Sequence, residues 1–162
     1  MFDSVQQFID VWRLESIATV RVLGALTDQS RDFPGAGQGR SLGEVAWHIV
    51  TALREIGEKV GIAVDGPKAE DPAPADAASI ERYYRRAAAS VSAVVSHWSD
   101  ETLQQLDDVY GERWKRGETL FALLTHEIHH RGQLTLLLRQ AGLRVPSVYG
   151  PSADESAPGV PR

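Results

Sequence analysis

The sequence predicts an all-α protein, a four-helix bundle. Four long segments carry apolar residues at three- and four-residue steps, which is the period of an amphipathic helix, and no segment shows the alternation of a convincing strand. Two longish connections between these segments complete the pattern of a bundle. With 162 residues, 43% of them apolar, the chain is long enough for one core, so we expect a single domain over 1–162.

The first helix is expected at about 3–27 and is followed by a loop. Its apolar stripe includes Phe8, Trp12 and Val22 at helical spacing. The segment 31–40, RDFPGAGQGR, contains one proline and three glycines, a composition that interrupts a helix.

The second helix is expected to begin sharply after Ser41. The sequence from Ser41 to Glu44 has the spacing of a capping box, in which the hydroxyl and the carboxylate satisfy backbone donors of the first turn. An apolar stripe then continues to Val60. The segment 65–78 is rich in proline, alanine and aspartate without apolar periodicity, so it is expected to be a long exposed connection.

The third and fourth helices are expected at about 77–98 and 118–142. The third is rich in alanine and arginine, and the fourth carries a stripe of leucines. Gly142 suits the left-handed C-cap position at the end of the fourth helix. The segment 103–117 is interpreted as irregular, and a Pro/Gly-rich tail begins at about 144.

Charge and cysteine content exclude several classes of protein. A formal net charge of -5 opposes binding to a phosphate backbone, so nucleic acid is not expected as a partner. No stretch reaches the roughly 18 continuous apolar residues of a membrane span. No secretory signal is recognisable, and a cytoplasmic location is expected. Because cysteine is absent, any thiol chemistry would need an external thiol.

Three of the five histidines lie on matching flanks of two helices. At about 100° per residue, His126 and His130 lie one turn apart on one flank of the fourth helix's apolar stripe, and Gln133 continues their line. His48 lies on the corresponding flank of the second helix. The three imidazoles are therefore expected to converge, whereas His129 faces away and is expected at or near the surface.

Three converging histidines predict a metal site. Imidazoles at positions i and i+4 leave a helix in the same direction and can close on one ion, with a third ligand from a facing helix. Such a set leaves a coordination position free for water or substrate, as in catalytic sites. We therefore expect His48, His126 and His130 to hold zinc, nickel, ferrous iron or cobalt, since imidazoles do not suit magnesium or calcium.

The residues from His126 to His130 also match the H-E-x-x-H pattern of metalloproteases. This alternative is disfavoured, because the extended continuation of the motif is missing and Glu127 turns toward the apolar stripe. His97 has a sufficient structural role at a helix C-terminus, where it complements the helix dipole. Glu15 and Arg131 fall within apolar stripes and are expected to need partners, with each other as candidates.

The residues around the three histidines resemble the DinB/YfiT-like superfamily of metal-dependent enzymes. The resemblance is carried by SLGEVAWHI at 41–49 and HEIHHRGQL at 126–134, with Thr119-Leu120 before the second segment and Gly142 after it. It implies an up-down-down-up four-helix bundle and a homodimer. It also implies a divalent metal on three histidines, which transfer to His48, His126 and His130.

The resemblance suggests a function as well. Characterised relatives include low-molecular-weight-thiol transferases and mycothiol-dependent maleylpyruvate isomerases, in which the metal activates a thiolate. The chain is therefore expected to be an S-transferase or isomerase that presents a small external thiol to an electrophilic substrate. The loops 31–40 and 143–151 are expected to shape the cavity mouth, with Tyr149 either as a polar contact or packing the tail.

Two alternatives stay open. A metal-dependent hydrolase would lower the pKa of water at the same open position, and Glu55, two turns beyond His48 on the same flank, is the nearest candidate for its general base. An ordinary solvated carboxylate is the other interpretation of Glu55. A metal-binding stress protein without catalysis would share every ligand but would have no exchangeable coordination position.

Overall fold

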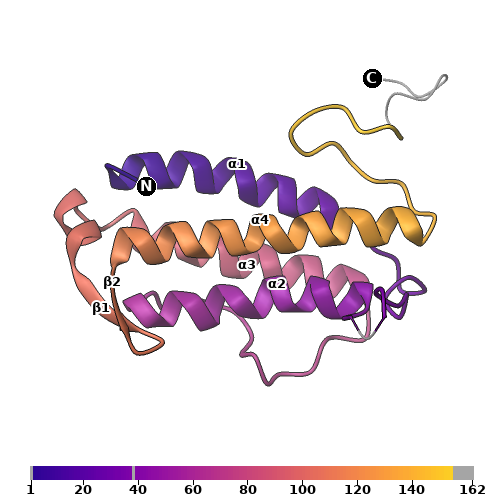
Figure 1. The fold of residues 1–162 in the computed structure, drawn as a ribbon, viewed down its shortest axis with the longest axis horizontal. Coiled ribbons are helices and arrows are strands. Elements are labelled where there is room, and N and C mark those ends of the chain that lie inside the picture. The colour runs from indigo at the N-terminus through magenta and orange to yellow at the C-terminus, as the bar shows by residue number, and fades with distance from the viewer. Residues whose placement is uncertain (1, 38, 155–162) are drawn as a thin grey trace.

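A computed structural model describes residues 2–37 and 39–154 of the chain. Within these ranges, four long helices lie side by side (Figure 1). They are α1 (Val5–Leu23), α2 (Leu42–Gly57), α3 (Ala77–Val95) and α4 (Arg116–Gln140). Short 3-10 helices, η1 (Glu58–Val60) and η2 (Asp100–Gln104), follow α2 and α3. The predicted all-α, four-helix architecture is confirmed.

The helices follow an up-down-down-up order. In Figure 1, α1 and α4 run in one direction and α2 and α3 in the other. The connection 61–76 returns the chain along the bundle, so that the parallel helices α2 and α3 can pack against each other. Helix α4 packs against both α1 and α2, and its contact with α2 is the one that positions the histidines.

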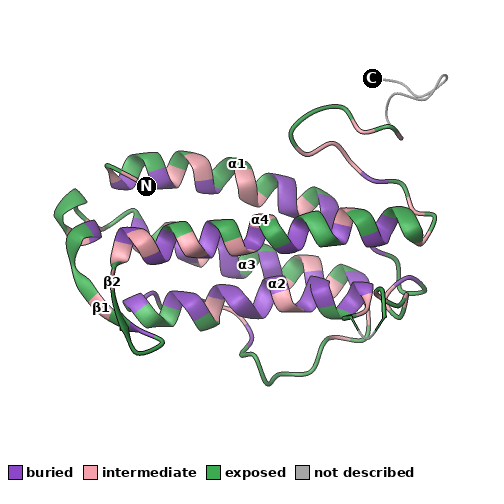
Figure 2. Ribbon diagram, viewed as in Figure 1, coloured by how far each residue is buried: buried purple, intermediate pink, exposed green. Residues whose placement is uncertain are grey.

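The core lies between the four helices, each of which carries buried residues, purple in Figure 2. Phe8 and Trp12 of α1 stack with ring centroids 5.7 Å apart. The Trp12 indole N–H donates to the Ala88 carbonyl of α3 at 3.1 Å. Both aromatic side chains are fully buried, so packing and a hydrogen bond together join α1 to α3.

Local signals in the sequence fix the helix ends nearest the site. The Ser41 hydroxyl accepts the Glu44 backbone N–H, and the Glu44 carboxylate accepts the Ser41 backbone N–H at 2.7 Å, which is the predicted capping box. At the end of α4, Gly142 has a φ of 74°, and the Leu143 N–H donates to the Leu138 carbonyl. This is a Schellman motif, as the position of Gly142 predicts.

Two of the predicted helices are longer than the observed ones. Helix α1 ends at Leu23 rather than at 27, and α3 ends at Val95 rather than at 98. In both cases, hydrogen bonds between residues three apart replace the last helical turn, as in the bonds from Leu26 N–H to the Leu23 carbonyl and from Trp98 N–H to the Val95 carbonyl. The part of the predicted tail at 155–162 lies outside the described residues.

The interpretation of 103–117 as irregular was wrong, since this segment contains a β-hairpin. Strand β1 (Leu106–Val109) pairs antiparallel with β2 (Glu112–Lys115). Tyr110 and Gly111 form the turn with φ values of 56° and 85°, and a type I′ turn requires this left-handed conformation at both positions. The strands are short and mostly charged, so no apolar alternation marks them. No described helix is long and apolar enough to cross a membrane.

Candidate metal centre

The structure brings together the three histidines that the sequence predicts. The Nε2 atoms of His48 on α2 and His126 on α4 lie 3.1 Å apart. The His130 ring centroid lies 4.5 Å from the centroids of both other rings. One ring nitrogen of each histidine lies within 4.8 Å of the others, so the group could hold a metal ion.

The donor set fits a divalent transition metal. Two nitrogens bound at about 2.1 Å lie roughly 3.0–3.4 Å apart at octahedral to tetrahedral angles. The 3.1 Å between His48 and His126 falls within this range. Because the group consists of imidazoles alone, it favours zinc, nickel, ferrous iron or cobalt over magnesium or calcium.

Burial keeps these imidazoles unprotonated. Desolvation is the largest cause that lowers the pKa of each of the three, and the pKa of His48 falls to about 4. The positive charge of Arg40 lowers all three pKa values further. At neutral pH, each ring therefore keeps a nitrogen lone pair available for a metal.

Gln133 orients one of the candidate ligands. His130 Nδ1 lies 2.8 Å from Gln133 Oε1, and a side-chain carbonyl only accepts hydrogen bonds, so Nδ1 carries the proton and Nε2 is the free acceptor. The Gln133 amide nitrogen in turn lies 3.1 Å from Nε2 of His129. The prediction that His129 lies at the surface is confirmed, and its ring contacts Gln133 and the His130 ring.

Glu127 points into the core and away from the histidine cluster. Its side chain is buried, and its Oε1 accepts hydrogen bonds from Thr19 of α1 at 2.7 Å and from Tyr84 of α3 at 2.8 Å. Burial raises the pKa of Glu127 to about 7. These partners hold Glu127 on the side of α4 that faces α1 and α3, whereas His126 faces α2, so Glu127 does not reach the cluster as a base and the metalloprotease alternative fails as expected.

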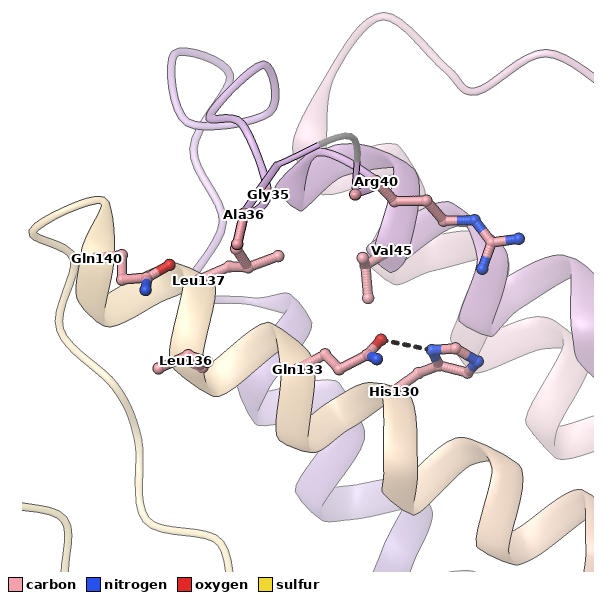
Figure 3. Close-up of a pocket in the computed structure, with 10 residues that line it drawn as sticks. Gly35, Ala36, Arg40, Val45, His130, Gln133, Leu136, Leu137 and Gln140 are labelled. Carbon is pink, nitrogen blue, oxygen red and sulfur yellow. Dashed lines mark hydrogen bonds between the residues drawn. The ribbon is translucent and has the colours of Figure 1, made fainter.

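A cavity of about 350 Å³ opens beside His130 (Figure 3). One wall is the loop 31–40, which includes Arg40, and the other is the last part of α4. The loop lies close against α2, because the Gly43 N–H donates to the Arg31 carbonyl at 2.8 Å. A Cβ at Gly43 would lie 2.9 Å from that carbonyl oxygen, so the contact requires glycine.

Comparison with known proteins identifies the family. The sequence model of the DinB family matches residues 1–161. The chain belongs to the DinB family. It is 37% identical over 158 residues to the uncharacterized protein YrdA of Bacillus subtilis strain 168, and the match covers 97% of this chain and 95% of YrdA. The resemblance carried by 41–49 and 126–134 is therefore confirmed.

Solved structures of DinB-like proteins share this fold. A DinB-like protein from Bacillus cereus ATCC 10987 is 36% identical, with a TM-score of 0.83 over 92% of this chain and all of that chain. The DinB-like protein YjoA of Bacillus subtilis is 19% identical, with a TM-score of 0.70 over 88% of this chain and 96% of that chain. The second likeness concerns the fold alone.

Tyr149 does not line the cavity beside His130; it contacts Glu15 of α1 and Arg131 of α4. Arg131 is buried and forms an ion pair with Glu15, as the sequence predicts, and it also donates to Thr19 Oγ1 at 3.0 Å. The Tyr149 hydroxyl donates to Glu15 at 2.8 Å and lies against the Arg131 guanidinium. It therefore ties the tail to α1 and α4, and none of the described residues at 143–151 lines the cavity beside His130.

Glu55 lies near the histidines, on the exposed side of α2. Its negative charge partly opposes the lowering of the pKa of His126 by burial, and its Oε1 accepts a hydrogen bond from the Tyr110 hydroxyl at 3.1 Å. Tyr110 belongs to the hairpin turn that the sequence does not reveal. The hairpin thus supplies a residue at this edge of the DinB site that no apolar pattern could have indicated.

Proposed function

We propose that this DinB protein is a metal-dependent S-transferase or isomerase that presents a small external thiol to an electrophilic substrate. The observation that supports it is the group of three imidazoles beside a cavity of about 350 Å³, in a chain without cysteine. When bound, a divalent transition metal supplies a positive centre that lowers the pKa of a coordinating thiol. Because no carboxylate belongs to the ligand group, none of that positive charge is neutralised by the protein ligands.

The chain's own residues would hold and shelter the reactants. His48, His126 and His130 are fixed by two packed helices, and Gln133 holds the His130 ring. Residues 35, 36, 39 and 40 and the last part of α4 would flank the reactants in the cavity beside His130. In a transfer, the thiol proton passes to solvent, the sulfur forms a bond to an electrophilic carbon, and the leaving group departs with its electron pair. In an isomerisation, the sulfur adds to a double bond and later leaves.

The proposal includes a homodimer in the cytoplasm. Small thiols are kept reduced in that compartment, and the dimer is implied by the resemblance to the DinB/YfiT-like superfamily. Small-molecule thiol and electrophile are then the partners, and neither nucleic acid nor membrane takes part.

A cobalt-loaded protein tests the proposal, because cobalt reports on its ligands by absorption. Addition of a small thiol is expected to produce a sulfur-to-cobalt charge-transfer band, and an electrophile should then be consumed together with the thiol. The same titration of His48→Ala protein should give no band. If no thiol perturbs the cobalt spectrum of the wild-type protein, the thiol-dependent function is wrong.

A metal-dependent hydrolase is the second candidate, favoured by the position of Glu55 near His126. That carboxylate could accept a proton from water at the open coordination position. Metal-dependent hydrolysis of an ester or amide that is lost in Glu55→Gln protein, without any thiol effect, would establish this function instead. A metal that exchanges no ligand with thiol or water would indicate a stress protein without catalysis.

A further inference from the structure

Arg40 carries a positive charge that no described carboxylate pairs with. It lies in the loop 31–40, across the cavity from His130 in Figure 3. Among residues 2–37 and 39–154, no ion pair or side-chain hydrogen bond involves its guanidinium. Its charge acts on Glu44, but the Glu44 carboxylate is already held by the Ser41 backbone N–H. The guanidinium is therefore free to bind a ligand.

The charge balance of the site calls for an anion. Arg40 and His130 line the same cavity (Figure 3), so the positive charge of Arg40 disfavours a further positive charge at the cluster. A divalent metal on three neutral imidazoles would place two more positive charges within the field of Arg40. Since the ligand group contains no carboxylate, an anion bound between the metal and Arg40 would relieve this repulsion.

The cavity between them suits a small organic molecule. Its volume of about 350 Å³ is that of a small-ligand site. Val45 and Leu137, which are buried, and Leu136, which is exposed, line this cavity and offer an apolar surface to a ligand. The amides of Gln133 and Gln140 add polar contacts. A ligand with an apolar body and one anionic group matches this lining.

The anionic group matches a carboxylate better than a phosphate. A single guanidinium binds one carboxylate through two parallel hydrogen bonds. A helix N-terminus often supports phosphate binding, but here the first turn of α2 is closed by the capping box of Ser41 and Glu44. Arg40 can therefore bind one carboxylate, but the site lacks the additional hydrogen-bond donors that a phosphate dianion needs.

We propose that this cavity binds a small organic carboxylate, with Arg40 pairing with the carboxylate, the apolar body against Val45, Leu136 and Leu137, and the reacting end at the histidines. This inference rests on the proposed function for two points, the metal at the histidines and the placement of the reacting end. It makes Arg40 a specificity-determining residue that selects carboxylate-bearing thiols or electrophiles.

Binding to the zinc-loaded protein, measured by calorimetry, tests this proposal. The probes are 3-mercaptopropionate and 4-phenylbutyrate, each compared with the neutral alcohol of the same length, 3-mercaptopropanol and 4-phenylbutanol. A charged hydrogen-bonded pair contributes about 1.5–3 kcal/mol, so the carboxylates should bind roughly 10- to 100-fold more tightly than the alcohols. Arg40→Gln should abolish this preference, and Arg40→Lys should keep part of it.

Arg13→Gln is the matched control, because Arg13 is an exposed arginine in the groove between α1 and α3. It removes one positive charge elsewhere and should leave the preference intact. Equal binding of carboxylate and alcohol, or an unchanged preference in Arg40→Gln protein with full zinc content, overturns the inference. If 4-phenylbutyrate binds through Arg40 but no thiol perturbs the cobalt spectrum, the carboxylate site stands and the thiol function fails.

Discussion

The Nε2 atoms of His48 and His126 lie 3.1 Å apart, although 78 positions separate the two residues in the chain. Each ring belongs to a different helix, and the packing of α2 on α4 brings the rings together. Two imidazoles this close repel each other when both are protonated. A metal ion bound by both nitrogens would take the place of this direct contact, and the consequences of its binding can be measured.

Replacement of one ligand should remove most of the bound metal. In His48→Ala protein, only the two histidines of α4 are left, and no other described metal-ligating group of three includes them. Elemental analysis after dialysis should therefore show a metal content far below one ion per chain. His129→Gln is the control, since His129 is exposed, and it should keep full stoichiometry. Full metal content and affinity in His48→Ala protein would mean that the three-histidine site is wrong.

Gln133 should matter for metal affinity although it is not a ligand. Gln133→Leu removes the acceptor for His130 Nδ1, so the ring loses its fixed orientation. Loss of a group that hydrogen-bonds to a metal-binding histidine typically weakens metal binding by about 10- to 100-fold. Competition with a chelator measures the change. Gln140→Leu, in the same cavity wall, should bind metal as the wild type does, and equal affinities in both variants would contradict the role of Gln133.

The metal-free protein should lose stability in mild acid because of His48. Its pKa is about 4 in the folded protein against an ordinary value of 6.5, so the unfolded chain takes up a proton more readily. This contribution to stability is present above pH 6.5 and is lost as the pH falls toward 4. Urea midpoints measured at several pH values should decline less in His48→Gln protein than in the wild type.

Glu127 should change the stability of the protein with pH in the direction opposite to His48. Its pKa is raised from 4.5 to about 7, so the folded protein holds a proton that the unfolded chain releases, and stability falls as the pH rises through this range. Urea midpoints of Glu127→Gln protein should therefore decline more steeply in acid than those of the wild type. Parallel pH profiles for the His48, Glu127 and wild-type proteins would contradict both pKa assignments.

Arg131 should be essential for stability. Its guanidinium is buried, pairs with Glu15 and donates to Thr19, so Arg131→Met leaves the Glu15 carboxylate without a positive charge beside it and with the Tyr149 hydroxyl as its hydrogen-bond donor. Breaking a buried pair in this way costs about 3–5 kcal/mol of unfolding free energy. The exposed pair of Arg139 with Asp154 gives the control, since Arg139→Met should cost about 1 kcal/mol or less. Urea denaturation compares the two, and similar losses would refute the role of burial.

The helices and the histidine cluster could be predicted because both depend on the regular spacing of residues in an α-helix. Long amphipathic segments fix the direction of every side chain to within a fraction of a turn, so the flanks of His48, His126 and His130 could be matched before any contact was known. Glu15 and Arg131 followed from the same reasoning, since a charge within an apolar stripe must find a partner.

Features that depend on contacts between segments without a period could not be predicted. The charged hairpin strands give no alternation, and the left-handed conformation of Tyr110 is unusual for an aromatic residue. The place of Tyr149 follows from the packing of the tail on Glu15 and Arg131. The loop that carries Arg40 is held against α2 by the hydrogen bond from the Gly43 N–H to the Arg31 carbonyl, and no sequence pattern predicts this bond.

The separation of His48 from His126 also sets an order of events during protein synthesis. At roughly 5–20 residues per second, the ribosome needs roughly 4–16 s to add the 78 residues between the first ligand and the second. During that interval, the nascent chain offers one candidate ligand of the three. Metal capture would therefore be nearly the last step of maturation, and loosely held ions encountered earlier would be released before the bundle closes.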